Sequence, residues 1–127
     1  MEAARVAREH KGRTSYHAGQ AAEQAVARAY LDRGCRMVAQ RWRAAGGEID
    51  LVFAHGDGFV FVEVKKSRTC AQAAYQIRPR QTARILAAAS AFVADQPAGQ
   101  LTEMRFDAAL VDSQGRIDII ENALSTG

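Results

Sequence analysis

The sequence predicts an α/β protein in which helices flank a mixed β-sheet of about five strands. Two observations support this fold class. Apolar residues recur with a helical period in two segments, and they form short runs or alternate with polar residues in five others. The predicted order is helix, three strands, helix and two strands, which is typical of a layered structure around one core.

Length and composition are those of an ordinary globular domain. The chain has 127 residues, of which 48% are hydrophobic and 24% charged, so one domain can bury a substantial core. We expect a mobile, charge-rich arm over residues 1–13, a single domain over residues 14–123 and a short tail over residues 124–127. The net charge of +3 is compatible with a polyanionic partner without requiring one.

The sequence argues against membrane-bound and secreted classes. No apolar run reaches the roughly 18 residues of a membrane-spanning helix, and the first residues lack the apolar core of a secretory signal. Cys35 and Cys70 show no metal-binding or redox spacing, so two reduced structural thiols are expected. These features predict a cytoplasmic protein without a membrane partner.

The first predicted helix runs over about residues 16–33 and stops at Gly34. Its apolar face repeats at helical spacing and consists of Ala22, Ala25, Val26 and Ala29. Glu23 borders this face. From the helix alone, a solvated glutamate is the simpler interpretation, because glutamate is rarely buried.

Three strands are predicted next. A short strand over residues 35–42 leads through small residues into a hairpin, whose strands at 47–53 and 59–65 flank a Gly/Asp turn. In the first hairpin strand, the two-residue period places Ile49, Leu51 and Phe53 on one face. In the second hairpin strand both faces are apolar along most of the length, which is typical of a central strand covered on two sides.

The rest of the chain is predicted to contain one helix and two strands. Residues 69–78 are small and polar and are assigned to a loop or frayed turn. Pro79 suits the first position of a helix that runs to about Ala94. Its apolar stripe consists of Ile85, Leu86, Ala89, Phe92 and Val93. Strands follow at about 104–111 and 116–121, paired as a hairpin.

Three charged residues, Asp50, Glu63 and Lys65, interrupt the hairpin strands. Charges in buried strands are costly unless they are paired or bound to metal. The hairpin brings Asp50 near Glu63, and two close carboxylates repel each other unless a cation lies between them. Oxygen ligands favour Mg²⁺ or Mn²⁺ over zinc. Lys65 can hold or activate a water or stabilise charge on a phosphate, so the set predicts a site for phosphodiester hydrolysis, against a plain surface ion pair.

These motifs resemble the PD-(D/E)xK nuclease superfamily. More narrowly, they resemble the YraN (UPF0102) family, a bacterial group described as predicted endonucleases similar to archaeal Holliday junction resolvases. The motifs are the pair Gly19 and Glu23, Gly-Glu-Ile-Asp-Leu-Val at 47–52, Phe-Val-Glu-Val-Lys at 61–65 and Arg-Phe-Asp at 105–107. The resemblance implies a three-layer, restriction-endonuclease-like core.

The resemblance also implies roles for individual residues. Asp50, Glu63 and the Val64 carbonyl would be metal ligands. Glu23 would reach the metal from the first helix, and we favour this role over the solvated one. Lys65 would be the catalytic lysine, acting with Asp50 and Glu63. Asp107 matches a family position, but its role stays open between core hydrogen bonding and the periphery of the site.

The chain departs from the family near the expected DNA contacts. The family commonly has lysine where Gln81 stands, and its arginine usually comes two residues after the catalytic lysine, whereas Arg68 comes one residue later. A glutamine can still hydrogen-bond a phosphate or position a water. The residues expected to contact nucleic acid border the site, and they are Arg41, Arg43, Lys66, Arg68, Arg78, Arg80, Gln81 and Arg84.

Two interpretations of this surface stay open. A solvated basic surface is the alternative to a nucleic-acid contact. Trp42 stands between two arginines and could stack on an unpaired base, although a core tryptophan is more common. No helix-turn-helix or zinc-finger spacing is present, so structure-selective or weakly selective binding is expected.

Together these features predict a Mg²⁺- or Mn²⁺-dependent nuclease that hydrolyses DNA. Branched recombination or repair intermediates are implied as substrates by the resemblance alone. The alternative is a non-catalytic nucleic-acid-binding module of the same fold, and a third reading is a structural protein that binds no metal. A symmetric homodimer would suit the cutting of both strands of a junction.

Overall fold

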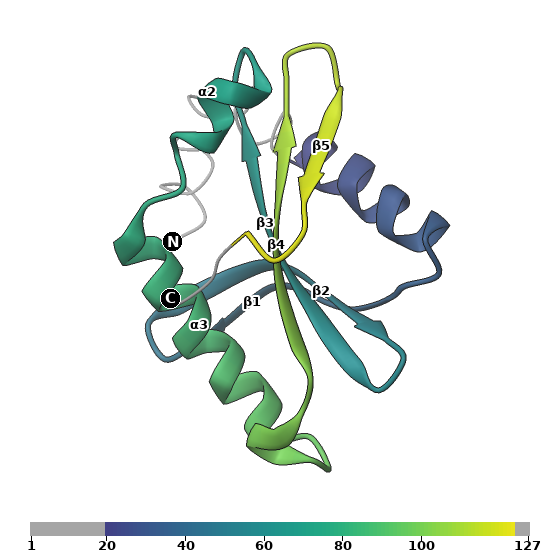
Figure 1. Cartoon of the computed structure of the whole chain (residues 1–127), viewed down its shortest axis with the longest axis vertical. Coiled ribbons are helices and arrows are strands. Elements are labelled where there is room, and N and C mark those ends of the chain that lie inside the picture. Colours follow the sequence, from purple (N-terminus) through teal and green to yellow (C-terminus); the bar gives the residue numbers. More distant parts are fainter. Residues whose placement is uncertain (1–19, 124–127) are drawn as a thin grey trace, which may run out of the picture.

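The structure is a computed structural model that describes residues 20–123, and Figure 1 shows its three layers. The sheet has the order β1-β2-β3-β4-β5, and only β3 and β4 are parallel neighbours. The strands are β1 (Arg36–Ala44), β2 (Gly47–His55), β3 (Gly58–Lys66), β4 (Met104–Val111) and β5 (Ile117–Ile120). The helical segments are a first helix over residues 20–32, α2 (Cys70–Ala74), α3 (Pro79–Ala94) and the 3-10 turn η1 (Gly99–Leu101). The predicted α/β fold with a mixed five-stranded sheet and a restriction-endonuclease-like core is confirmed.

The first helix covers one face of the sheet. Its buried residues Val26 and Tyr30 belong to a core cluster with Leu51 and Val62, and the Tyr30 ring stacks on Phe53 with centroids 4.7 Å apart. In Figure 1 this helix, drawn in purple, lies on the side of the sheet opposite α3. Burial of these apolar surfaces is the main force that holds the layer in place.

Helix α3 covers the other face. Pro79 occupies its N-terminal turn, as predicted, where the missing N–H costs no hydrogen bond. Phe92 makes edge-to-face contacts with Trp42, Phe59 and Phe61, at centroid distances of 5.3, 5.1 and 5.7 Å. Trp42 is therefore a core residue between the sheet and α3, which settles the alternative left open for it.

Strand β3 is the central strand and is covered on both faces, as predicted. Phe59 and Phe61 pack toward α3, whereas Val60 and Val62 pack toward the first helix. Glu63 continues the alternation of Phe59 and Phe61, so the pleat of β3 delivers its carboxylate to the α3 side of the sheet.

The predicted face of Ile49 is wrong. Leu51 and Phe53 pack toward the first helix, but Ile49 packs with Val52 in the cluster beneath α3. The regular pairing of β2 with β3 ends at Leu51, and from there the Asp50 side chain accepts the Val64 N–H at 2.8 Å. A side-chain contact thus replaces a ladder bond, and the strict two-residue alternation does not continue through this point.

The predicted apolar faces of the two long helices need small corrections. Ala25 is exposed, and Tyr30 is the large residue that the first helix buries. In α3 the predicted Leu86 is only half-buried, while Ala88 is fully buried. In both helices the observed buried stripe is displaced from the predicted one by a fraction of a helical turn, because each helix crosses a twisted sheet.

Residues 69–78 are not simply a loop, because they contain α2. Thr69 caps this short helix by accepting the Gln72 N–H at 3.1 Å. Ala73 is buried in a small cluster with Ala108 and Leu110 of β4. Helix α2 therefore packs against the sheet and precedes α3 in the chain, as Figure 1 shows.

The structure does not describe every segment for which the sequence made a prediction. The arm at 1–13, the predicted start of the first helix, Gly19 and the tail at 124–127 lie outside the described residues. Within residues 20–123, none of the helices combines the length and apolar character that crossing a bilayer requires.

Candidate active site

Asp50 and Glu63 meet where β2 and β3 part. The Asp50 carboxylate accepts the Val64 N–H, which fixes it beside the backbone of the residue that follows Glu63. Glu63 is 5% exposed. Burial, and after it the charge of Asp50, raises the pKa of Glu63 to about 8. The structure therefore brings the two carboxylates together, as the hairpin prediction required.

Two other side chains hold the Glu63 carboxylate. Gln81 of α3 donates its Nε2 hydrogen to Oε1 at 3.0 Å, and the Lys65 ammonium lies 3.2 Å from the same oxygen. Lys65 is itself largely buried, so its charge acts in a region with little water to screen it. These contacts only partly offset the burial and repulsion that raise the Glu63 pKa.

The pKa values of Asp50 and Glu23 are also raised above those of free carboxyl groups. Burial is the main cause that raises the pKa of Asp50, and the Val64 hydrogen bond opposes it. Burial, followed by the charge of Asp50, raises the pKa of Glu23. The electrostatic influence of Asp50 therefore extends to the first helix as well as to β3.

Glu23 is oriented by an arginine of β1. Its carboxylate lies 3.2 Å from the Arg41 guanidinium, and Arg41 has a positive φ of 49°. Within residues 20–123, no three Asp, Glu, His or Cys side chains are grouped closely enough to hold a metal ion by themselves. Asp50 and Glu63 thus form a carboxylate pair, and Glu23 stands beside them.

The donor set of this pair nevertheless suits Mg²⁺ or Mn²⁺. Magnesium usually binds through one or two carboxylates and keeps several waters or substrate oxygens, so a third protein carboxylate is not required. Burial, and after it the charge of Asp50, raises the pKa of Glu63, so the two carboxylates would ionise together more readily beside additional positive charge. A divalent cation would supply that charge, and the Val64 backbone lies next to Asp50.

A cavity of about 520 Å³ opens onto Asp50 and Glu63. The turn between β1 and β2 forms one wall, and Gln81, Arg84 and Ile85 of α3 form another. Gly47 allows these walls to approach, since a Cβ at this position would collide with the Arg84 carbonyl. The glycine of the Gly-Glu-Ile-Asp motif thus has a packing reason close to the site.

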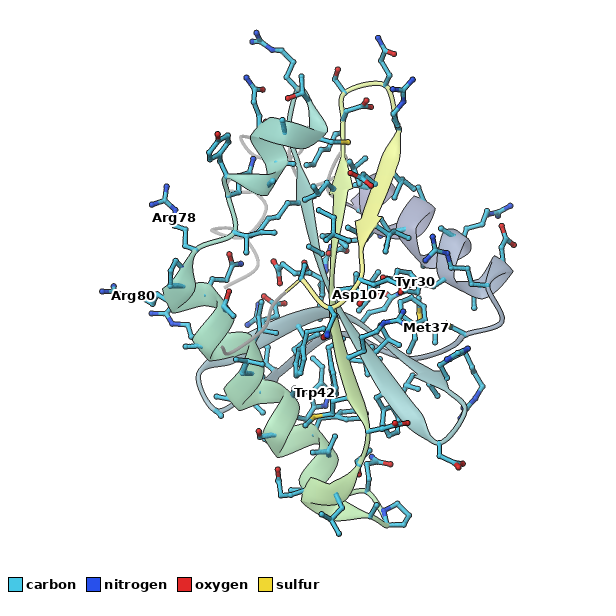
Figure 2. The ribbon with its side chains drawn as sticks, in the orientation of Figure 1. Tyr30, Met37, Trp42, Arg78, Arg80 and Asp107 are labelled. Carbon is cyan, nitrogen blue, oxygen red and sulfur yellow. The ribbon has the colours of Figure 1, made fainter. Side chains whose placement is uncertain are left out.

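The predicted basic residues do not form one cluster. Arg43 and Arg84 line the cavity, and Arg43 also pairs with Glu48 at 3.5 Å. Figure 2 shows Arg78 and Arg80 projecting away from the body at the start of α3. Three further predicted contacts are exposed but do not line the cavity, and they are Arg41, Lys66 and Arg68.

Asp107 is a core hydrogen-bonding residue, which settles the alternative left open by the sequence. It is fully buried and accepts hydrogen bonds from the Tyr30 hydroxyl at 2.6 Å and from Arg105 at 2.9 and 3.0 Å. It also accepts the Asn122 N–H at 3.0 Å. Figure 2 shows Tyr30 and Asp107 close together. Asp107 therefore faces the first helix, whereas Glu63 faces α3.

Two residues that bear on the function of the protein were not singled out from the sequence. Glu48 lines the cavity, and its charge contributes to the raised pKa of Asp50. The sequence did indicate Glu48, because residues two apart in a strand share one face and Glu48 is two residues from Asp50. Tyr75 follows α2 and is 85% exposed. Its only signal was an aromatic residue inside a polar segment.

The fold and this pair of carboxylates define an α/β protein with a restriction-endonuclease-like core and a carboxylate–lysine cluster on β2 and β3. The chain belongs to the uncharacterised protein family UPF0102, whose family model matches residues 22–121.

Several bacterial UPF0102 proteins resemble the chain over most of their length. The protein of Roseobacter denitrificans is 54% identical over 121 residues, which cover 95% of this chain and 94% of the relative. A protein of Cereibacter sphaeroides is 54% identical over 90% of this chain and 97% of its own length. The protein of Ruegeria pomeroyi is 52% identical over 92% of this chain and 95% of its own length. The family assignment therefore rests on nearly the whole chain.

Proposed function

We propose that the protein is a metal-dependent nuclease that hydrolyses phosphodiester bonds of DNA. One observation carries the proposal. Asp50 and Glu63 are adjacent and largely buried, they line a cavity bordered by arginines, and the Lys65 ammonium lies beside Glu63. A structural ion pair needs neither a second buried carboxylate nor such a cavity.

Asp50 and Glu63 are the residues that would hold Mg²⁺ or Mn²⁺, with the Val64 carbonyl as a backbone ligand. Bound there, such an ion would polarise the phosphate and increase the acidity of a water molecule. Glu23 would assist from the first helix by contacting the ion or its waters. Gln81 is a positioning residue, because it holds the Glu63 carboxylate through its amide.

Lys65 is the proposed catalytic lysine. Its ammonium lies 3.2 Å from the carboxylate of Glu63, and Glu63 lines the cavity where a phosphate would approach. In that position it can orient the attacking water or stabilise the negative charge that develops on the phosphate. Limited exposure to solvent strengthens this interaction relative to a surface lysine.

The exposed arginines would bind the DNA backbone. Arg43 and Arg84 at the cavity, and Arg78 and Arg80 at the start of α3, can neutralise phosphates without reading the base sequence. Binding selective for DNA structure is therefore proposed. Branched recombination or repair intermediates are the substrates that the family resemblance favours.

The test is cleavage of plasmid, single-stranded and four-way-junction DNA with Mg²⁺ or Mn²⁺, by wild type and by Lys65→Ala and Asp50→Ala. Cleavage by wild type that both substitutions abolish supports the proposal. DNA binding without cleavage of any substrate with either metal would instead identify a nucleic-acid-binding module of the same fold.

A further inference from the structure

Tyr75 presents an aromatic ring to solvent in the segment that joins α2 to α3. The residue is 85% exposed and follows directly after α2. The other aromatic residue considered for nucleic-acid contact, Trp42, is packed against Phe92 and cannot offer a free face in the same way. Tyr75, and not Trp42, is therefore the aromatic side chain with a ring face free to stack on a base.

The segment that carries Tyr75 is fixed on both sides. The Tyr75 N–H donates to the Gln72 carbonyl at 3.2 Å, and the next side chain, Gln76, donates to the Lys66 carbonyl at 3.0 Å. Ile77 then packs into the core beneath α2 and α3. Tyr75 precedes Gln76, and Lys65 precedes Lys66. The Gln76–Lys66 hydrogen bond therefore holds the backbone of Tyr75 at the end of β3 that carries the proposed catalytic lysine.

Exposed basic residues precede and follow this segment in the chain. Lys66 and Arg68 are exposed at and after the end of β3, and Arg78 and Arg80 project from the start of α3. Lysines and arginines bind phosphates, and an exposed aromatic ring between them can stack on a base. A fully paired duplex keeps its base faces covered, whereas a single strand, flap or junction exposes them.

We propose that Tyr75 stacks on an unpaired base of the DNA bound at the active site and thereby favours DNA with unpaired nucleotides. This inference rests on the proposed function, because it assumes that DNA lies along Lys65. Arg78 and Arg80 hold the flanking phosphates. The proposal makes Tyr75 a residue that determines substrate specificity, and it leaves hydrolysis to the Asp50, Glu63 and Lys65 group.

The stack can be measured with a fluorescent adenine analogue whose emission falls when it stacks on an aromatic ring. The probe is placed in the single-stranded flap of a DNA duplex, and a fully paired duplex serves as the second ligand. Proteins carrying Lys65→Ala prevent cleavage during the titration. Into this background we would introduce Tyr75→Ala, Tyr75→Phe and, as a matched exposed control at η1, Leu101→Ala; Leu101 is 91% exposed.

The expected result is loss of quenching in Tyr75→Ala, with flap affinity lowered at least about fivefold, the lower end of the cost of losing one base–aromatic stack. Tyr75→Phe and Leu101→Ala should keep both quenching and affinity. Duplex affinity should be unchanged in all variants. Unchanged quenching in Tyr75→Ala, or an equal loss of affinity for flap and duplex, would overturn the inference.

Failure of this inference is distinguishable from failure of the proposed function. If wild type cleaves DNA with Mg²⁺ while Tyr75→Ala leaves the flap preference intact, the nuclease proposal is supported and the stacking role is refuted. If Tyr75→Ala selectively weakens flap binding while wild type cleaves none of the substrates, the stacking role is supported and the nuclease proposal is refuted. Absence of any DNA binding by the Lys65→Ala protein and by wild type contradicts both.

Discussion

At the residue scale, Glu63 combines burial with a neighbouring carboxylate, and its pKa of about 8 follows from both. Without a bound cation, the side chain is therefore mostly protonated at neutral pH. A cation that binds the ionised form would release this proton, so metal affinity should increase with pH. The same residue thus links folding stability to metal binding.

The first prediction concerns Glu63→Gln in metal-free protein. The folded-state pKa is raised, so protonation of Glu63 stabilises the native state most at low pH, and that stability is lost as pH rises from about 4.5 toward about 8. The glutamine cannot ionise. Denaturant unfolding with EDTA should show similar stability for both proteins near pH 5 and a variant more stable by about 3–5 kcal/mol near pH 8.5. A difference that does not change with pH would contradict this.

The second prediction separates catalysis from metal binding at Lys65. Lys65→Ala should lower the single-turnover rate of DNA cleavage by about 100-fold or more, which is typical of losing one preorganised group that stabilises transition-state charge. Mn²⁺ affinity should fall little or rise, because the ammonium is not a ligand and competes for Glu63. Equal loss of cleavage and metal binding would show that Lys65 only supports the carboxylates.

At the element scale, the close approach of β2 to α3 depends on Gly47. Gly47→Ala should destabilise the protein by about 1–3 kcal/mol, because the new Cβ meets the Arg84 backbone and α3 must shift. Gly56→Ala is the matched control: it has a positive φ of 60° but open space, so only backbone strain opposes it. Thermal unfolding that finds Gly47→Ala the milder change would refute this account of the motif.

The elements themselves were largely predictable, because hydrophobic periodicity determines which residues a strand or long helix can bury. The main exceptions have separate causes. Ile49 changes face where the Asp50 side chain replaces a ladder bond. Helix α2 is five residues long, too short for a periodic pattern, and its capping residue Thr69 was its clearest signal. Ala25 is exposed because the angle between helix and sheet is a tertiary property.

At the scale of the whole molecule, the site draws on segments far apart in sequence. The juxtaposition of Asp50 and Glu63 was predictable, since a hairpin joins their strands. The bond from Gln81 to Glu63 spans 18 residues and depends on how α3 packs, so no local pattern could indicate it. The Glu23–Arg41 pair likewise needs the first helix to be docked on the sheet.

The charge distribution leads to a prediction about salt. DNA binding by the whole protein should weaken as salt rises, because each neutralised phosphate releases counterions. Arg78→Ala and Arg80→Ala should each reduce the slope of log affinity against log salt by about one, without changing base preference. Arg33→Ala, which lies after the first helix beside Glu121, is the control and should leave the slope unchanged. Identical slopes in all four proteins would exclude the start of α3 from the DNA interface.

The central claim is that the carboxylates of β2 and β3 form a divalent-cation site, and calorimetric titration with Mn²⁺ tests it most directly. The wild type should bind one Mn²⁺ per chain at the pair, and Asp50→Asn should abolish this binding. Asp118→Asn, at an exposed position of β5, should bind as wild type does. Absence of Mn²⁺ binding by the wild type, or equal binding by Asp50→Asn, would contradict the claim.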